Sequence, residues 1–181
     1  MLNACDTIGI IALSGACDRE KVELAKANLE EMGFKVKLSK NIYDQNRYLA
    51  GSDEDKIKEL ERFFEDDEVK LILCARGGYG AIRLINKINY GLIKSNPKYF
   101  CGFSDVTALL LMIYKKTGFV TYHSPMACTD FLYVNENTKQ NFFKAINILH
   151  TKCFSMFGSS SSRLFSNSII LSLTNLNIIS F

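Results

Sequence analysis

The chain is poor in the residues that most often mark metal-binding, membrane or disulfide-rich proteins. Among 181 residues it has no tryptophan, two prolines and two histidines, and its six cysteines include no Cys-x-x-Cys pair. The common zinc sites need paired cysteines or several histidines, so they are excluded. Apolar runs such as residues 8–13 are far shorter than the about 18 residues of a membrane helix. We expect a cytoplasmic protein with reduced thiols, no metal ion and no contact with a membrane.

An excess of charge of one sign is also missing. The chain has 22 basic and 19 acidic residues, and the two signs alternate in segments such as 56–62. Proteins that bind nucleic acids usually concentrate basic residues on one face, so we expect no nucleic acid partner. With 48% apolar residues, a chain of 181 residues is long enough for one domain with a real core, but short for two.

Strand-like and helix-like segments alternate along most of the chain. Short β-branched apolar runs predict strands, and apolar residues at helical spacing after Asp18 and Ser52 predict helices. The predicted strands are residues 7–13, 34–38, 69–75, 99–103 and 119–122, and the predicted helices are about 18–33, 52–68, 81–88, 106–114 and 138–149. Helix 106–114 is apolar almost all round, which predicts that it is buried. The alternation predicts an α/β fold with a mainly parallel sheet.

The composition changes after about residue 150. Residues 150–181 are rich in serine and asparagine, and no acidic residue follows Glu136. Residues 169–176 have strand propensity and no charge, so they are an aggregation hazard unless they are packed. We therefore divide the chain into a domain of residues 1–149 and an atypical tail of residues 150–181.

Polar or glycine-rich segments follow four of the predicted strands. They contain, in chain order, Ser14, Arg76, Gly77, Gly78, Tyr79, Ser104 and His123. The carboxyl ends of parallel strands meet at one edge of a sheet, and ligands bind in the crevice beyond that edge. We expect Ser14, Arg76, Tyr79 and His123 to contact a substrate there.

Ser104 lies where a predicted buried strand turns into a predicted helix. Such a turn can expose a hydroxyl and direct helix N-terminal amides at a developing oxyanion, as in a nucleophile elbow. Ser104 or Asp105 can equally cap the helix, because serine and aspartate favour that position in any protein. The spacing alone leaves both interpretations open.

The glycines of residues 76–80 let a backbone pass close to a ligand, or simply form a tight turn. No Gly-Lys-Ser/Thr sequence follows and the dinucleotide spacing is incomplete, so a nucleotide-binding domain is the weakest interpretation. His123 can contact a substrate or make a structural hydrogen bond beside Pro125. His150 fits a solvated surface role, because a histidine needs an orienting partner to serve as a base.

Five segments together resemble the LD-carboxypeptidase family, which includes murein tetrapeptide carboxypeptidases and microcin C self-immunity peptidases. The resemblance covers about residues 6–148 and occurs in the family's order. Its motifs are DTIGIIA at 6–12, YLAGSD at 48–53, CARGGYG at 74–80, GFSDVTAL at 102–109 and HSPM at 123–126. It implies a Rossmann-like or flavodoxin-like N-terminal domain, normally followed by a second domain, in a cytoplasmic homodimer.

The resemblance also implies an activity and a set of site residues. The family hydrolyses the amide between the L-centre of meso-diaminopimelate and the terminal D-alanine of murein tetrapeptide, in cell-wall recycling and without a cofactor. Ser104 corresponds to the serine nucleophile. The amide of Asp105 and that of Gly77 or Gly78 correspond to the oxyanion hole.

This chain departs from the family pattern in one important respect. The family's triad is Ser-Glu-His, and its glutamate and histidine come from the C-terminal domain, for which nothing here matches. The smaller departures, Leu13 for a proline and Ser124 for a glycine, do not threaten the fold. A serine peptidase without its base accelerates hydrolysis only about 10³–10⁴-fold over the uncatalysed reaction in water. We therefore expect a truncated chain that is nearly inactive alone; the alternative is a non-catalytic peptide-binding or dimerisation module.

Overall fold

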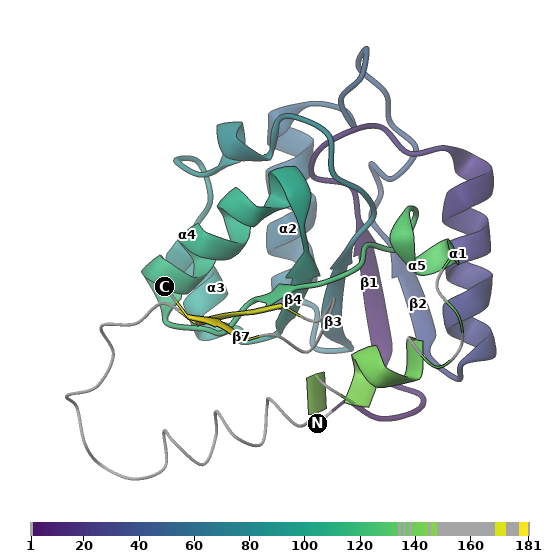
Figure 1. Cartoon of the computed structure of the whole chain (residues 1–181). Coiled ribbons are helices and arrows are strands. Elements are labelled where there is room, and N and C mark those ends of the chain that lie inside the picture. The colour runs from purple at the N-terminus through teal and green to yellow at the C-terminus, as the bar shows by residue number, and fades with distance from the viewer. Residues whose placement is uncertain are drawn as a thin grey trace, which may run out of the picture.

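A parallel sheet forms the centre of the molecule (Figure 1). The computed structural model describes residues 2–133, 135, 137, 139–144, 146–147, 169–172 and 178–180. The strands that sequence patterns predict are β1 (Thr7–Ile11), β2 (Lys35–Leu38), β3 (Val69–Cys74), β4 (Tyr99–Gly102) and β5 (Tyr122–His123), all parallel in the order β2-β1-β3-β4-β5. The predicted α/β fold with a mainly parallel sheet is confirmed.

Two further strands extend the sheet beyond β5. Strand β6 (Ile169–Ser172) pairs with β5 in parallel, and β7 (Ile178–Ser180) pairs with β6 in antiparallel orientation. Both strands come from the serine- and asparagine-rich segment, whose other residues lie outside the described part of the chain. The predicted strand propensity around residue 170 thus coincides with β6.

Helices cover both faces of the sheet. The labelled helices are α1 (Arg19–Glu31), α2 (Asp53–Glu65), α3 (Tyr90–Ser95), α4 (Thr107–Thr117) and α5 (Asp130–Tyr133). Helices α1 and α5 contact each other on one face, and α2, α3 and α4 form a contiguous layer on the other. Local capping fixes two starts, because Asp18 accepts from the amides of Glu20 and Lys21, and Ser52 accepts from the amide of Asp55.

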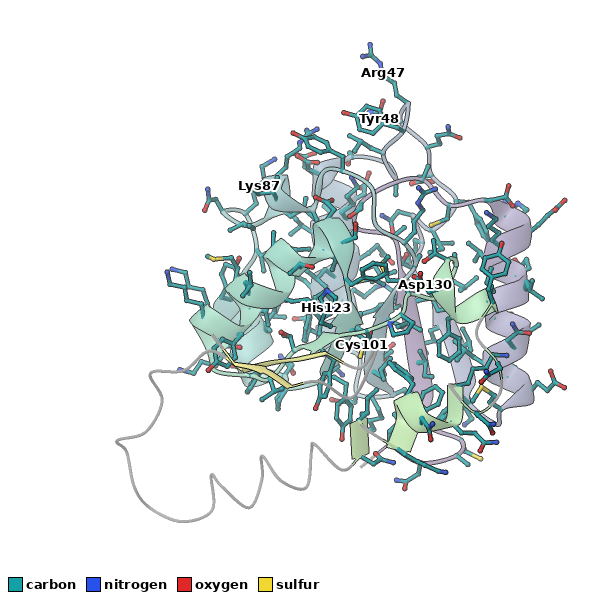
Figure 2. The ribbon with its side chains drawn as sticks, viewed as in Figure 1. Arg47, Tyr48, Lys87, Cys101, His123 and Asp130 are labelled. Carbon is teal, nitrogen blue, oxygen red and sulfur yellow. The ribbon has the colours of Figure 1, made fainter. Side chains whose placement is uncertain are left out.

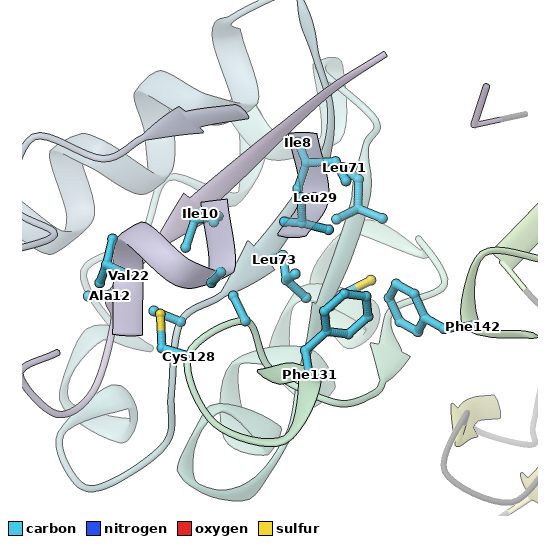
Figure 3. Packing of buried hydrophobic residues seen from close by; sticks show 14 of the residues in the cluster. Ile8, Ile10, Ala12, Val22, Leu29, Leu71, Leu73, Cys128, Phe131 and Phe142 are labelled. Atoms are coloured by element: carbon cyan, nitrogen blue, oxygen red, sulfur yellow. The ribbon is translucent and has the colours of Figure 1, made fainter. Parts of the chain in front are cut away.

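The hydrophobic core is divided between the two faces of the sheet. Alternate residues of the central strands face α1 on one side, as in the cluster of Figure 3, which includes Ile8, Ile10, Leu29 and Phe131. The residues between them face α2 and α4. Strand β1 is buried along its whole length, which explains its nearly continuous apolar sequence.

Several sequence-based helix predictions need correction. The segment predicted as one helix over 81–88 forms a short 3-10 turn, η1 (Ala81–Leu84), and a separate helix α3 begins after Asn89, whose side chain accepts from the amide of Leu92. Helix α5 was not predicted. Helix α4 is not buried all round, since Leu111 is 41% exposed.

Of predicted helix 138–149, residues 139–144 and 146–147 are helical and the others lie outside the described residues.

None of the described helices is both long enough and apolar enough to cross a bilayer.

Candidate active site

The segments that follow β1, β3, β4 and β5 meet at the carboxyl edge of the sheet. The amide of Gly15, after β1, donates to the carbonyl of Gly77, after β3, at 3.3 Å. The amide of Ser124, after β5, donates to the carbonyl of Gly102 at the end of β4 at 3.0 Å. Parallel pairing therefore brings together the segments that the sequence predicts to meet there.

Ser104 lies at a sharp bend out of β4. Its φ of 61° is in the left-handed region, which non-glycine residues rarely adopt, and its side chain is exposed. Strand β4 ends at Gly102, and the 3-10 turn η2 (Ser104–Val106) leads directly into α4. A serine on a strained turn between a buried strand and a helix has the geometry of a nucleophile elbow.

Gly77 lies directly against Ser104. A Cβ atom on residue 77 would come within 2.9 Å of both Cβ and Oγ of Ser104, closer than such atoms approach in real structures. Glycine is therefore required at this position, and the hydroxyl of Ser104 borders the backbone of the glycine loop, residues 76–80. This juxtaposition joins two motifs that are separated by 27 positions in the sequence.

Asp105, the residue after Ser104, ties three segments of the edge together. Its Oδ2 accepts from the hydroxyl of Ser14 at 2.8 Å and from the amide of Ala81, also at 2.8 Å. Ser14 is fully buried, so its hydroxyl is committed to this carboxylate. Through Asp105 the end of β1, the end of the glycine loop and the serine turn form one hydrogen-bonded unit.

Within the glycine loop, Gly78 and Gly80 have φ values of 133° and 118°, which only glycine adopts without strain. A Cβ at Gly80 would come within 2.9 Å of Leu49 Cδ2, in the neighbouring 48–53 segment. The guanidinium of Arg76 folds back over the loop and donates to the carbonyls of Gly77 and Ala16, each at 3.2 Å. The loop is thus shaped by glycine conformations and fixed by backbone contacts.

Two tyrosines stand at the rim of this edge. Tyr79 is 57% exposed and Tyr48 is 60% exposed, and their ring centroids are 6.3 Å apart in an edge-to-face arrangement. Figure 2 shows Tyr48 and Arg47 on the loop that projects farthest from the sheet. Of the expected substrate contacts, Tyr79 and Arg76 are accessible, whereas the hydroxyl of Ser14 is turned inward to Asp105.

His123 ends β5 beside the strand that leads to Ser104. It pairs in register with Gly102, and its ring packs against that of Phe103 at a centroid distance of 5.7 Å. Burial lowers the pKa of this imidazole, and its buried Nδ1 has no hydrogen-bond partner among the described residues. His123 therefore favours the neutral form.

One buried charge near the site lies outside the sequence-based candidates. The charge pattern includes Lys56 among interspersed surface charges, but its side chain is fully buried in α2 below the glycine loop. The helical spacing of the sequence could have predicted this burial, because Lys56 precedes Leu60 and Phe63 by four and seven residues and so lies on the apolar face of the helix.

Among the described residues, no three or more histidine, cysteine, aspartate or glutamate side chains form a group that could bind a metal ion.

The chain matches the family model of the LD-carboxypeptidase N-terminal domain over residues 8–124. It is 46% identical over 129 residues to a Bacillus subtilis protein described as a "probable murein peptide carboxypeptidase", covering 71% of this chain and 40% of that protein. It is 29% identical over 121 residues to the murein tetrapeptide carboxypeptidase of Pseudomonas aeruginosa, covering 66% of this chain and 39% of that enzyme. The chain thus spans about two fifths of the length of these curated relatives.

Solved structures give the same result at the level of the fold. The crystal structure of a MccF-like protein of Bacillus anthracis aligns with a TM-score of 0.72 at 35% identity, covering 78% of this chain and 44% of that one. The muramoyltetrapeptide carboxypeptidase of Oxalobacter formigenes aligns with a TM-score of 0.68 at 25% identity, covering 76% and 46%. On the match of its residues 8–124 and on these relatives, the chain belongs to the LD-carboxypeptidase family.

Proposed function

We propose that this chain carries the nucleophile of a serine carboxypeptidase of the LD type. The substrate is murein tetrapeptide, cleaved between meso-diaminopimelate and the terminal D-alanine. The observation that supports this most directly is that Ser104 is exposed on a strained turn, with its hydroxyl next to the backbone of Gly77. The family and the names of its relatives support the class of reaction.

In this mechanism Ser104 Oγ attacks the carbonyl carbon of the scissile amide. The amide of Asp105 and that of Gly77 or Gly78 stabilise the oxyanion of the tetrahedral intermediate. Arg76 and Tyr79 contact the peptide at the rim, and His123 lines the crevice as a neutral group. Ser14 supports the site through its hydrogen bond to Asp105.

We place the general base and its carboxylate outside residues 1–149, as the resemblance to the family implies. Loss of the base in a serine peptidase costs on the order of 10⁶ in turnover. The isolated chain is therefore expected to release almost no D-alanine. By the same resemblance we propose a cytoplasmic homodimer that uses no metal or organic cofactor.

A chimera tests the role of Ser104 without depending on the isolated chain. Residues 8–124 of this chain replace the matching segment of the Bacillus subtilis relative, and D-alanine release from murein tetrapeptide is measured. We expect turnover that Ser104→Ala abolishes, whereas Ser95→Ala, at the end of α3 on the opposite edge of the sheet, leaves it unchanged. A folded chimera without turnover, or turnover that survives Ser104→Ala, would refute the proposal.

Two further measurements separate the remaining possibilities. Several neighbouring structures are microcin C7 self-immunity proteins, one of them in complex with aspartyl sulfamoyl adenosine, so the chimera is also assayed with an aminoacyl nucleotide. Calorimetry of the isolated chain with tetrapeptide tests the alternative of a non-catalytic binding module. If tetrapeptide at high concentration produces no heat of binding and no thermal shift, that module is excluded.

A further inference from the structure

Lys56 is an unusual residue in the interior of this protein. Lysine is almost never fully buried without a partner, yet this side chain is fully buried, and its Nζ has no hydrogen-bond partner among the described residues. The Nζ lies 3.8 Å from where a Cβ on Gly80 would stand, so the ammonium group rests against the backbone of the glycine loop.

The charges of Asp53, Asp105 and Arg83 act on this ammonium group. Burial lowers the pKa of Lys56, the charges of Asp53 and Asp105 oppose that shift, and the charge of Arg83 adds to it. Asp53 Oδ2 is already paired with Arg83 and Lys87, at 3.0 and 3.3 Å, although its buried Oδ1 has no partner among the described residues. The surrounding charges therefore favour a positive Lys56 without forming a close ion pair with it.

Such a residue does not contribute to stability in the usual way. Desolvating a charge without a hydrogen bond costs free energy, and apolar residues of similar size often replace buried charges with a gain in stability. A methionine has nearly the length of lysine and would fill the same space below Gly80. Packing alone therefore does not explain a lysine at this position.

We propose that Lys56 is a positioning residue, whose buried positive charge holds the carboxylate of Asp105 and the glycine loop in the arrangement that brings Gly77 to Ser104. The inference rests on the proposed function for its significance, but not for its geometry. Asp105 binds the amide of Ala81, the residue after Gly80, so both features near Lys56 belong to one turn. The ammonium group lies on the interior side of this turn, so it acts on the turn without contacting the substrate.

The substitution Lys56→Met separates positioning from packing, because the two roles predict opposite results. For a positioning role, the unfolding temperature stays equal or rises, while hydrogen exchange at the amide of Ala81, which donates to Asp105, becomes at least about tenfold faster. Lys56→Arg keeps the charge and should restore most of the protection. Lys58→Met, an exposed lysine of the same helix, is the matched control and should change neither quantity.

Each result of this experiment decides the question. Unchanged exchange at the amide of Ala81 in Lys56→Met, or a variant that no longer folds, would overturn the proposal. As a second measurement, the side-chain nitrogen of Lys56 is observed by NMR in the unmodified chain at neutral pH. A neutral amine there would also overturn it.

The chimera then connects the inference to the reaction. Lys56→Met should lower kcat for D-alanine release by about tenfold or more with little change in KM, because misplaced catalytic groups affect turnover first. An inactive chimera would refute the proposed function but leave the exchange results standing. An active chimera in which Lys56→Met has no effect on kcat would refute the positioning role alone.

Discussion

The ends of strands β1 and β4 are each followed by a serine, but the two serines are held in opposite ways. Ser14 follows β1, is fully buried, and donates its hydroxyl to Asp105. Ser104 follows β4, is exposed, and has a strained backbone with φ of 61°. One serine thus supports the edge from within, while the other lies exposed at the surface of that edge. A serine at a strand end therefore has its role set by the backbone conformation and by what surrounds it.

The largest effect on this comparison is expected from Gly77→Ala. The new methyl group would come within 2.9 Å of Ser104 Oγ and force one of the two turns to move. A displacement of about 1 Å can cost roughly 100-fold in turnover, so D-alanine release by the chimera should fall by at least that factor. Gly91→Ala, in α3, is the control and should preserve turnover; full activity of Gly77→Ala would contradict the close contact.

Ser14→Ala tests the supporting role of the buried serine. The substitution leaves one side of the Asp105 carboxylate without its donor, which should lower the free energy of unfolding by about 1–3 kcal/mol. Urea denaturation of the chain measures this loss. Ser95→Ala, on the surface, should stay within about 0.5 kcal/mol of the wild type. Equal stability of the two variants would mean that the bond to Asp105 contributes nothing.

Ser104→Gly should have the opposite sign. Glycine adopts a positive φ without strain, so this variant is expected to be more stable than the wild type by about 1 kcal/mol, while it loses the proposed nucleophile. Ser104→Ala removes the same hydroxyl but keeps the Cβ, and it should show no such gain. Unfolding temperatures of the two variants, measured side by side, isolate the backbone strain. A glycine variant no more stable than the alanine variant would argue against it.

The smallest effect concerns His123 and pH. Burial lowers the pKa of this histidine below its usual 6.5, so the unfolded chain takes up the proton first as the pH falls. Its contribution to stability is therefore complete above about pH 6.5 and decreases as the pH falls below that value. Urea denaturation of the wild type and of His123→Phe is measured at pH values from about 7.5 to about 5, the range in which histidine titrates. The free energy of unfolding should fall less in the variant than in the wild type. Parallel curves would contradict this assignment.

Local signals accounted for much of the fold. Asp18 caps α1 as predicted, and of the two caps predicted for α2, Ser52 or Asp53, the structure has Ser52, because a cap needs only a side chain and the amides that follow it. The predictions of β1 and β3 succeeded for a similar reason, since a strand buried on both faces has a nearly continuous apolar sequence. The single helix predicted over 81–88 failed, because Asn89 starts a new helix that its own apolar pattern does not reveal.

The details of the site depend on contacts between distant parts of the chain. The position of Ser104 at a strand end followed from the sequence, but its positive φ did not, since no local rule assigns that conformation to serine. The bond between Ser14 and Asp105 joins residues 91 positions apart, and no periodicity predicts it. The helical spacing from Leu60 was enough to predict the burial of Lys56. It could not predict that the Nζ of Lys56 points toward Gly80.

The carbonyl of Gly77 has a consequence for the neighbouring amide. It accepts from the amide of Gly15 and from Nε of Arg76, and the chain has no cis peptide bond among its described residues. In a planar trans peptide the N–H of Gly78 points opposite to this carbonyl. Two donors on one side therefore prevent the peptide plane from flipping, and a glycine pair that would otherwise be among the most pliable parts of the chain keeps one amide dipole in a constant direction.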